Sequence, residues 1–218
     1  MKINIKGPIV PNSEGWIYSM FGLPYTSPEL VLSSISEAEH KKDKLDVFIN
    51  SGGGDVFSGS EIYSALRSYP GQVNIHVVGL AASAASVIAM AGYSDISPTA
   101  QLMVHNVSCQ TCGDYHEMDS TSEMLKKANR AIASAYVEKT GMSERDALDL
   151  MDCETWLTAS DAVAYGLIDE VAKSQNVDNC GGFVSLQNSV NEIIPHTIID
   201  SMIKRKVNLI NFFTKKED

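Results

Sequence analysis

The chain has few positive charges and no long, strongly apolar run, and both shortages limit its function. Its 17 Lys and Arg residues stand against 27 Asp and Glu residues, which gives a formal net charge of −10. Because phosphate groups are bound by basic surfaces, this balance argues against nucleic acid as a partner. Residues 77–92 carry no charge, but they are mostly Ala, Gly and Ser between a strand pattern and a turn. We therefore expect no membrane helix and no membrane partner.

Cysteines and secretion signals are also scarce. The chain has four cysteines in 218 residues, and its first residues, MKINIKGPIVPNSEGW, include no apolar signal segment. This predicts a cytoplasmic protein without a disulfide framework. Cys109 and Cys112 form a C-x-x-C pair, but Cys153 and Cys180 lack the spacing of a second zinc-ligand pair. The pair also lacks a thioredoxin-like helix start, so we interpret it as coincidental and expect no metal and no cofactor.

The order of apolar patterns predicts an α/β fold. Strand patterns over 45–50 and 73–79 alternate with helical patterns over 28–42, 57–69 and 83–91. Such alternation is typical of a parallel sheet with right-handed crossovers. The first of these helices begins with Pro28, and Ser27 is its expected cap. Further segments complete the expected set: short strands within 94–105, a long helix over 115–139 and short helices from 143 and 158, before a strand at 167–171.

The character of the sequence changes after Ala172. Residues 174–186 are typical of a linker, and residues 187–218 contain apolar residues at helical spacing with a basic cluster at 204–206. We expect a core domain over 1–173 and a linker with a helical appendage over 174–218.

A glycine-rich stretch, NSGGGDVFSG, follows the strand pattern at 45–50. Glycines between a strand and a helix let backbone amides approach a ligand oxygen. A nucleotide loop is excluded, because no Gly-Lys-Ser/Thr is present and Phe57 stands where G-x-G-x-x-G needs its last glycine. The stretch on its own is compatible with a binding loop or with a simple tight turn.

Ser83 lies where the second strand pattern passes into an Ala-rich helix. A serine at this junction is either the cap of the helix or a nucleophile, with the amide of Ala84 as an oxyanion donor. Ser86, one turn later, is expected to be a packed hydroxyl bonded back to the helix backbone.

A nucleophilic serine needs a base, and His105 is the best placed histidine. It ends the apolar strand LMVH, after which the sequence turns polar. His76 lies within a strand and is expected to be structural or at the surface. The remaining histidines, expected to be solvated, are His40, His116 and His196. A carboxylate must orient the base, and residues 149–154 offer three: Asp149, Asp152 and Glu154.

Four motifs in order resemble the proteolytic subunit of the Clp protease, and the match runs from about residue 45 to 172. INSGGGDV is similar to the family's I-N-S-P-G-G-S-V, GLAASAAS to its nucleophile segment G-x-A-A-S-M-G-A, and LMVHN to its M-I-H-Q. WLTASDAVAYGLIDEV follows F-L-T-A-x-E-A-x-x-Y-G-L-I-D-x-V. The resemblance implies a ClpP/crotonase-like fold of repeated ββα units with a protruding handle helix, the handle covering about 106–139.

The resemblance also implies roles for single residues. Ser83 becomes the nucleophile and His105 the general base, and the amides of Gly54 and Ala84 form the oxyanion hole. Glu154 falls on the family's triad Asp. Since Glu is one methylene longer, Asp152 is the alternative acid.

The implied function is a serine endopeptidase that cleaves protein or peptide substrates inside a self-assembled ring, heptameric and single or stacked in two. Departures from the family's pattern and the added tail are more similar to the ClpP-like proteases of phages and prophages. Those imply head maturation by cleavage of scaffold or capsid proteins, in a bacterial host cell or a procapsid, without an obligatory Clp ATPase. Two alternatives stay open: a catalytically impaired structural or binding subunit, and a crotonase-type coenzyme A thioester enzyme.

Overall fold

A computed structural model describes residues 1–173 and 194–214. The predicted linker and Cys180 lie outside the described residues. The elements follow one another in this order: β1 (Lys2–Lys6), α1 (Gly15–Met20), α2 (Pro28–Lys41), β2 (Leu45–Ser51), α3 (Val56–Ser68), β3 (Val73–Ala82), α4 (Ala84–Ala89), β4 (Tyr93–Ile96), β5 (Gln101–Val104), α5 (Tyr115–Thr140), α6 (Glu144–Asp152), β6 (Thr155–Thr158), α7 (Ala159–Ala164), β7 (Glu170–Val171) and α8 (His196–Thr214).

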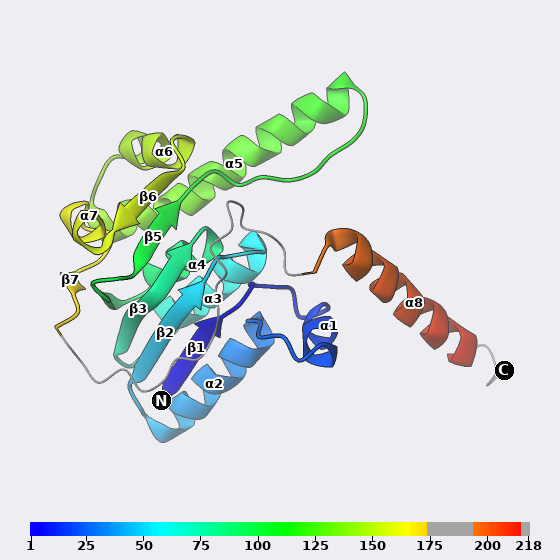
Figure 1. The fold of residues 1–218 in the computed structure, drawn as a ribbon, viewed down its shortest axis with the longest axis horizontal. Coiled ribbons are helices and arrows are strands. Elements are labelled where there is room, and N and C mark those ends of the chain that lie inside the picture. The colour runs from blue at the N-terminus through cyan, green and yellow to red at the C-terminus, as the bar shows by residue number, and fades with distance from the viewer. Residues whose placement is uncertain (174–193, 215–218) are drawn as a thin grey trace.

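One twisted sheet forms the centre of this mixed α/β fold (Figure 1). The strand order is β1-β2-β3-β4-β7, and β5 pairs with β3 and β6. The strands are parallel as expected, except that β6 runs antiparallel to β5. β3 pairs with β4 along its first half and with β5 at its end, where Leu80 is level with Gln101. This branch point brings the residues after β3 and β5 to the same end of the sheet.

The helix termini are set by short polar side chains. Ser143 accepts the amide of Asp146 at the start of α6, where the sequence predicts a short helix to begin. The prediction that Ser27 caps α2 is wrong, because its side chain makes no capping hydrogen bond. Instead, the side chain of Asn12 accepts the amide of Glu29 at 2.9 Å. A cap from a distant loop leaves no local sequence signal.

The core lies between the sheet and its helices and is built from aliphatic side chains of β1–β5 and α2–α7. The α5 helix belongs to it only in part. Ile132 and Tyr136 are buried, whereas Met118, in the first turn of the same helix, is 40% exposed. The reason is visible in Figure 1, where the N-terminal half of α5 projects beyond the sheet. The predicted handle helix therefore protrudes from the body.

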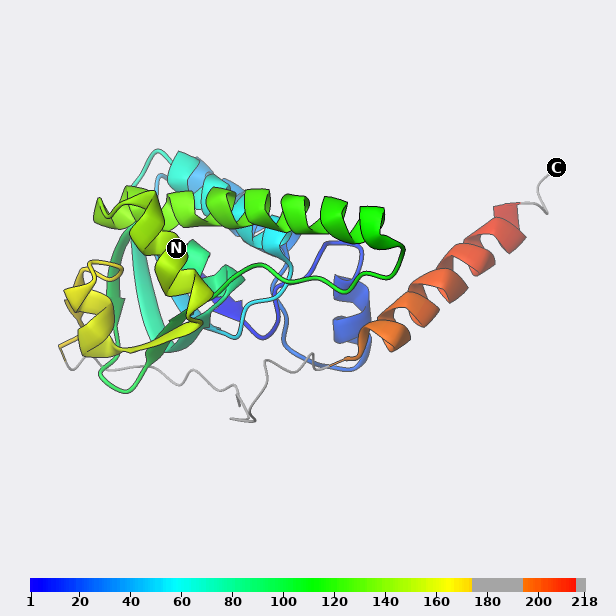
Figure 2. The same cartoon turned by 90° about the horizontal axis from the view of Figure 1, so that it is seen from above.

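A second, smaller apolar cluster joins α1 to α8. Ile194 and Ile199 are buried together with Val10, Ile17 and Tyr18. The first turns of α8 thus rest on α1, and the helix then extends away from the body (Figure 2). Within residues 1–173 and 194–214, no helix has the length and hydropathy needed to cross a membrane.

Candidate active site

Ser83 connects β3 to α4 in a backbone conformation that side chains rarely adopt. Its φ is 55° and its ψ is −126°, values that resemble the first central position of a type II′ turn, where glycine is favoured. Such strain costs about 1–3 kcal/mol and persists only where the surroundings impose it. Here the Ser83 amide donates to the carbonyl of Met103 on β5 at 3.0 Å. The sharp strand-to-helix turn places the half-buried serine at the end of the sheet, an arrangement similar to the nucleophile turn of α/β-hydrolases.

The glycine loop after β2 approaches this turn closely. A Cβ on Gly53 would lie 2.6 Å from the Ala82 carbonyl oxygen and from the Ser83 Cβ, and Gly53 also has a φ of +92°. The loop is held by Ser51, which is buried, accepts the Gly53 amide and donates to the carbonyl of Gly7. The glycine-rich stretch is therefore more than a tight turn, because it forms one wall beside Ser83.

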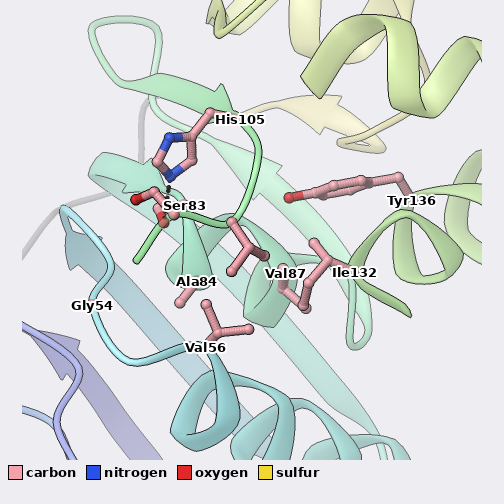
Figure 3. Close-up of a pocket in the computed structure, with 10 residues that line it drawn as sticks. Gly54, Val56, Ser83, Ala84, Val87, His105, Ile132 and Tyr136 are labelled. Atoms are coloured by element: carbon pink, nitrogen blue, oxygen red, sulfur yellow. Dashed lines mark hydrogen bonds between the residues drawn. The ribbon is translucent and has the colours of Figure 1, made fainter. Parts of the chain in front are cut away.

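His105 lies directly after β5 and faces Ser83 (Figure 3). Its Nε2 is 2.8 Å from Ser83 Oγ. Burial lowers the pKa of His105, and the charge of Glu154 partly opposes that effect. Near neutral pH the imidazole is therefore uncharged, which is the state that accepts a proton from a serine hydroxyl.

The three candidate carboxylates lie at the end of α6, and none is hydrogen-bonded to His105 among the described contacts. Asp152 instead accepts a hydrogen bond from the side-chain amide of Asn106, at 2.7 Å. Glu154 is exposed and has a φ of +46°, in the turn between α6 and β6. Its charge acts on His105. Asp149 lies 3.9 Å from Arg145 on the outside of α6.

Two backbone amides are available beside Ser83. Gly54 and Ala84 both line the pocket at the serine. No acceptor for either amide is found within the part of the chain that the structure describes. The amide of Ala84 lies at the first turn of α4, where the helix leaves amides unpaired.

The pocket has a volume of about 70 Å³. Beyond the serine and the histidine its wall is mainly apolar, with Val56 from α3, Val87 from α4, and Ile132 and Tyr136 from α5 (Figure 3). The sequence predicted the helix that carries Ile132 and Tyr136 but gave no sign that these side chains border Ser83. That contact depends on how α5 packs against α4.

Other predicted polar residues lie away from the pocket. Cys109 and Cys112 are free and exposed, and no group of three potential metal ligands occurs among residues 1–173 and the described part of α8. His76 is an internal strand residue as expected, with Nδ1 2.7 Å from Asp95. His40 and His116 are exposed. The side chain of His196 is not among those that the structure describes.

Comparisons with known proteins agree on one family. A family model described as Clp protease matches residues 29–175. The ATP-dependent Clp protease proteolytic subunit 1 of Streptomyces avermitilis is 32% identical over 140 residues, which cover 63% of this chain and 64% of that relative. The match thus spans less than two thirds of the relative's length. Among solved structures, a mutant ClpP1 of Listeria monocytogenes has a TM-score of 0.67 at 22% identity, covering 80% of this chain and 92% of the other. That likeness shows the fold.

Proposed function

Because this chain belongs to the Clp protease family, we propose that it is a serine endopeptidase with Ser83 as nucleophile and His105 as general base. The observation that carries the proposal is the 2.8 Å contact between Ser83 Oγ and His105 Nε2. Ser83 sits on a strained turn, and burial lowers the pKa of His105. Together these give a hydroxyl that borders the pocket and a neutral base at the same point.

In the proposed reaction, Ser83 Oγ attacks the carbonyl carbon of the substrate's peptide bond while His105 Nε2 takes the hydroxyl proton. The carbonyl oxygen becomes an oxyanion, which accepts hydrogen bonds from the amides of Gly54 and Ala84. Loss of one such donor lowers the rate by about 10²–10³-fold in other enzymes. His105 then gives the proton to the leaving amine, and water hydrolyses the acyl-enzyme by the same steps. Neither a metal nor a cofactor takes part.

Glu154 is the proposed partner of His105, because its charge acts on the imidazole. Asp152 is the alternative, and it is bound to Asn106. A carboxylate in this role stabilises the imidazolium that forms during attack and fixes the tautomer of the ring. The longer side chain of Glu154 has to reach the ring from an exposed turn.

The pocket favours an apolar residue on the acyl side of the cleaved bond. Its wall is formed largely by Val56, Val87, Ile132 and Tyr136. A charged side chain would lose its hydration there, and the described lining offers no opposite charge to compensate. The proposed substrates are therefore proteins or peptides cleaved after small or medium-sized apolar residues.

The proposed setting follows from the resemblance of the sequence motifs. Self-association into rings, heptameric and single or stacked, would enclose the sites. Head maturation of a phage or prophage in the cytoplasm of a bacterial host, with scaffold or capsid proteins as substrates, is the proposed biological role. The Streptomyces relative is named as ATP-dependent, but the chemistry proposed for Ser83 needs no nucleotide. We also propose that the chain consists of a core domain over 1–173 and a linker with a helical appendage over 174–218.

The Ser83–His105 contact also separates the proposal from one of its two alternatives. Stabilising a thioester enolate needs backbone amides but no serine-histidine pair, so the contact favours peptidase chemistry over a coenzyme A enzyme. An impaired binding subunit is the remaining competitor, since no described hydrogen bond joins His105 to a carboxylate.

The test is labelling of the full-length protein with a fluorophosphonate, whose phosphorus reacts with an activated serine. The wild type, Ser83→Ala and His105→Ala are compared, and cleavage of casein and of short apolar peptides is measured in parallel. We expect labelling and cleavage by the wild type alone. An unlabelled wild-type oligomer would contradict the peptidase and favour the binding subunit.

A further inference from the structure

Two buried hydroxyl groups connect α5 to the backbone of Ser83. The Ser86 side chain is 0% exposed and Tyr136 is 2% exposed. Ser86 Oγ donates to the carbonyl oxygen of Ser83 at 2.6 Å, and it lies 2.8 Å from the hydroxyl oxygen of Tyr136. Buried polar groups are costly unless they are paired, so a chain of two such bonds needs a reason in this apolar region.

The direction of the protons follows from the number of donors. A carbonyl oxygen can only accept a hydrogen bond, so Ser86 donates its single hydroxyl proton to the carbonyl oxygen of Ser83. The proton between Ser86 and Tyr136 must then come from Tyr136. Burial raises the pKa of Tyr136 to about 12, so its hydroxyl keeps that proton at all working pH values. The order is Tyr136 to Ser86 to the Ser83 carbonyl.

The Ser83 carbonyl shares a planar peptide unit with the Ala84 amide. In a trans peptide the C=O and N–H bonds point in opposite directions. Holding the Ser83 carbonyl on the α4 side therefore aims the Ala84 amide away from the helix. The amides of Ser86 and Val87 also donate to this carbonyl, at 2.9 and 3.4 Å, and the Ser86 hydroxyl adds a third donor at a strained residue.

We infer that Ser86 and Tyr136 are positioning residues that fix the Ser83–Ala84 peptide and so aim the Ala84 amide at the developing oxyanion. The inference rests on the proposed peptidase function. Neither residue touches the reacting atoms; each acts through the carbonyl of Ser83. Because Tyr136 belongs to α5, the position of this projecting helix sets the geometry of the oxyanion donor.

The decisive variants are Ser86→Ala and Tyr136→Phe in the full-length protein. Ser86→Ala removes both hydrogen bonds but no side chain from the pocket wall. Tyr136→Phe removes one oxygen and keeps the ring. The second-order rate of fluorophosphonate labelling is measured together with kcat and KM for an apolar peptide, and thermal melting and oligomer size show whether each variant is folded.

We expect Ser86→Ala to label about tenfold more slowly, because a misaimed oxyanion donor loses part of its effect. Tyr136→Phe should also slow labelling, but by a smaller factor. Both changes should lower kcat and leave KM near the wild-type value. The double variant should be no slower than Ser86→Ala, since Tyr136 acts through Ser86.

Each variant has a matched control. Ser134→Ala removes a hydroxyl that bonds back to Ala131 on the outside of α5. Tyr63→Phe removes a hydroxyl on α3 that donates a hydrogen bond to Glu138 on α5. Both controls should label at the wild-type rate.

The outcomes separate this inference from the proposed function. A labelled wild type with Ser86→Ala and Tyr136→Phe at unchanged rates would overturn the positioning role and leave the peptidase intact. Fully additive losses in the double variant would also overturn it. An unlabelled wild type would overturn the proposed function and the inference with it. If Ser86→Ala does not fold, Tyr136→Phe decides the question alone.

Discussion

The side-chain amide of Asn106 lies 2.7 Å from a carboxylate oxygen of Asp152, so one candidate acid is bound to the residue next to His105 and not to His105 itself. The charge that acts on His105 is that of Glu154. We therefore expect Glu154→Gln to lower kcat/KM by about 10²-fold or more, because the tautomer and the charge of the imidazole lose their partner. Asp152→Asn should lower it less than about tenfold, since it alters only a neighbouring contact.

Steady-state kinetics on one apolar peptide decide between the two carboxylates. Asp149→Asn is the control, because this third carboxylate lies beside Arg145 on the outside of α6. A larger loss in Asp152→Asn than in Glu154→Gln would transfer the role to Asp152.

The pH dependence of kcat/KM should report His105. Burial lowers its pKa below the ordinary value of 6.5, and only the neutral imidazole acts as a base. Activity is therefore expected to be full at mildly alkaline pH and to fall as the pH drops through the lowered pKa. Glu154 raises the pKa of His105, so in Glu154→Gln the acid limb should move to still lower pH. An acid limb above pH 6.5 in the wild type would contradict this assignment.

Gly53 should tolerate no side chain. In Gly53→Ala the new Cβ would lie within 2.6 Å of the backbone of Ala82 and the Cβ of Ser83, so the glycine loop must move away from the serine. We expect more than about 10²-fold loss of labelling rate, because small displacements at a reacting centre are this costly. Gly22→Ala is the matched control. Gly22 also has a positive φ, +64°, but nothing lies within 4 Å of its added Cβ, so only stability should fall, by about 1 kcal/mol.

His76 should make stability depend on pH in the opposite sense to a paired carboxylate. Its hydrogen bond to Asp95 raises the pKa of His76 in the folded chain, with the charge of Asp46 adding to the effect against the cost of burial. The stabilisation is fully present below the unfolded pKa of about 6.5 and is lost as the pH rises through the raised folded pKa. The difference in melting temperature between wild type and His76→Gln should therefore be largest near pH 6 and shrink toward pH 9. A difference that grows with pH would refute this.

The contact between α1 and α8 should depend on one side of α8. Ile199 is 2% exposed, whereas its neighbour Ile198 is 46% exposed. Ile199→Ala is expected to cost about 2–4 kcal/mol in the docking of α8, as for other buried isoleucines, and Ile198→Ala well under 1 kcal/mol. Hydrogen exchange of the α1 and α8 amides measures the difference. Fluorophosphonate labelling of Ser83 should be the same in both variants.

The sequence predicted the parts of the fold that carry strong local patterns. The helices now seen as α2, α3 and α5 begin and end within one residue of the expected positions. Ser86 bonds back to the helix backbone as predicted. β1 and α1 were not predicted, and α1 begins without a side-chain cap that would mark its start in the sequence.

The parts of the candidate site that sequence could not supply are contacts between distant elements. Ser83 and His105 were paired from motif order, and the structure brings them into hydrogen-bond distance. Nothing local identified Tyr136 as the partner of Ser86, since the contact joins α5 to α4 across fifty positions of sequence. The bond of Asp152 to Asn106 likewise depends on how the end of α6 lies against the segment that follows β5. Such contacts form only when the elements pack together in the folded chain, so no local pattern in the sequence indicates them.

The apolar cluster between α1 and α8 joins opposite ends of the described chain, and this imposes an order on folding during synthesis. The strands and helices that carry Ser83 and His105 are complete before the codons for α8 are translated. Closing so long a loop costs conformational entropy, and such contacts form late. A nascent chain therefore exposes the apolar side of α1 until α8 has left the ribosome. Through that interval a chaperone or a neighbouring nascent chain has access to the surface that α8 later covers.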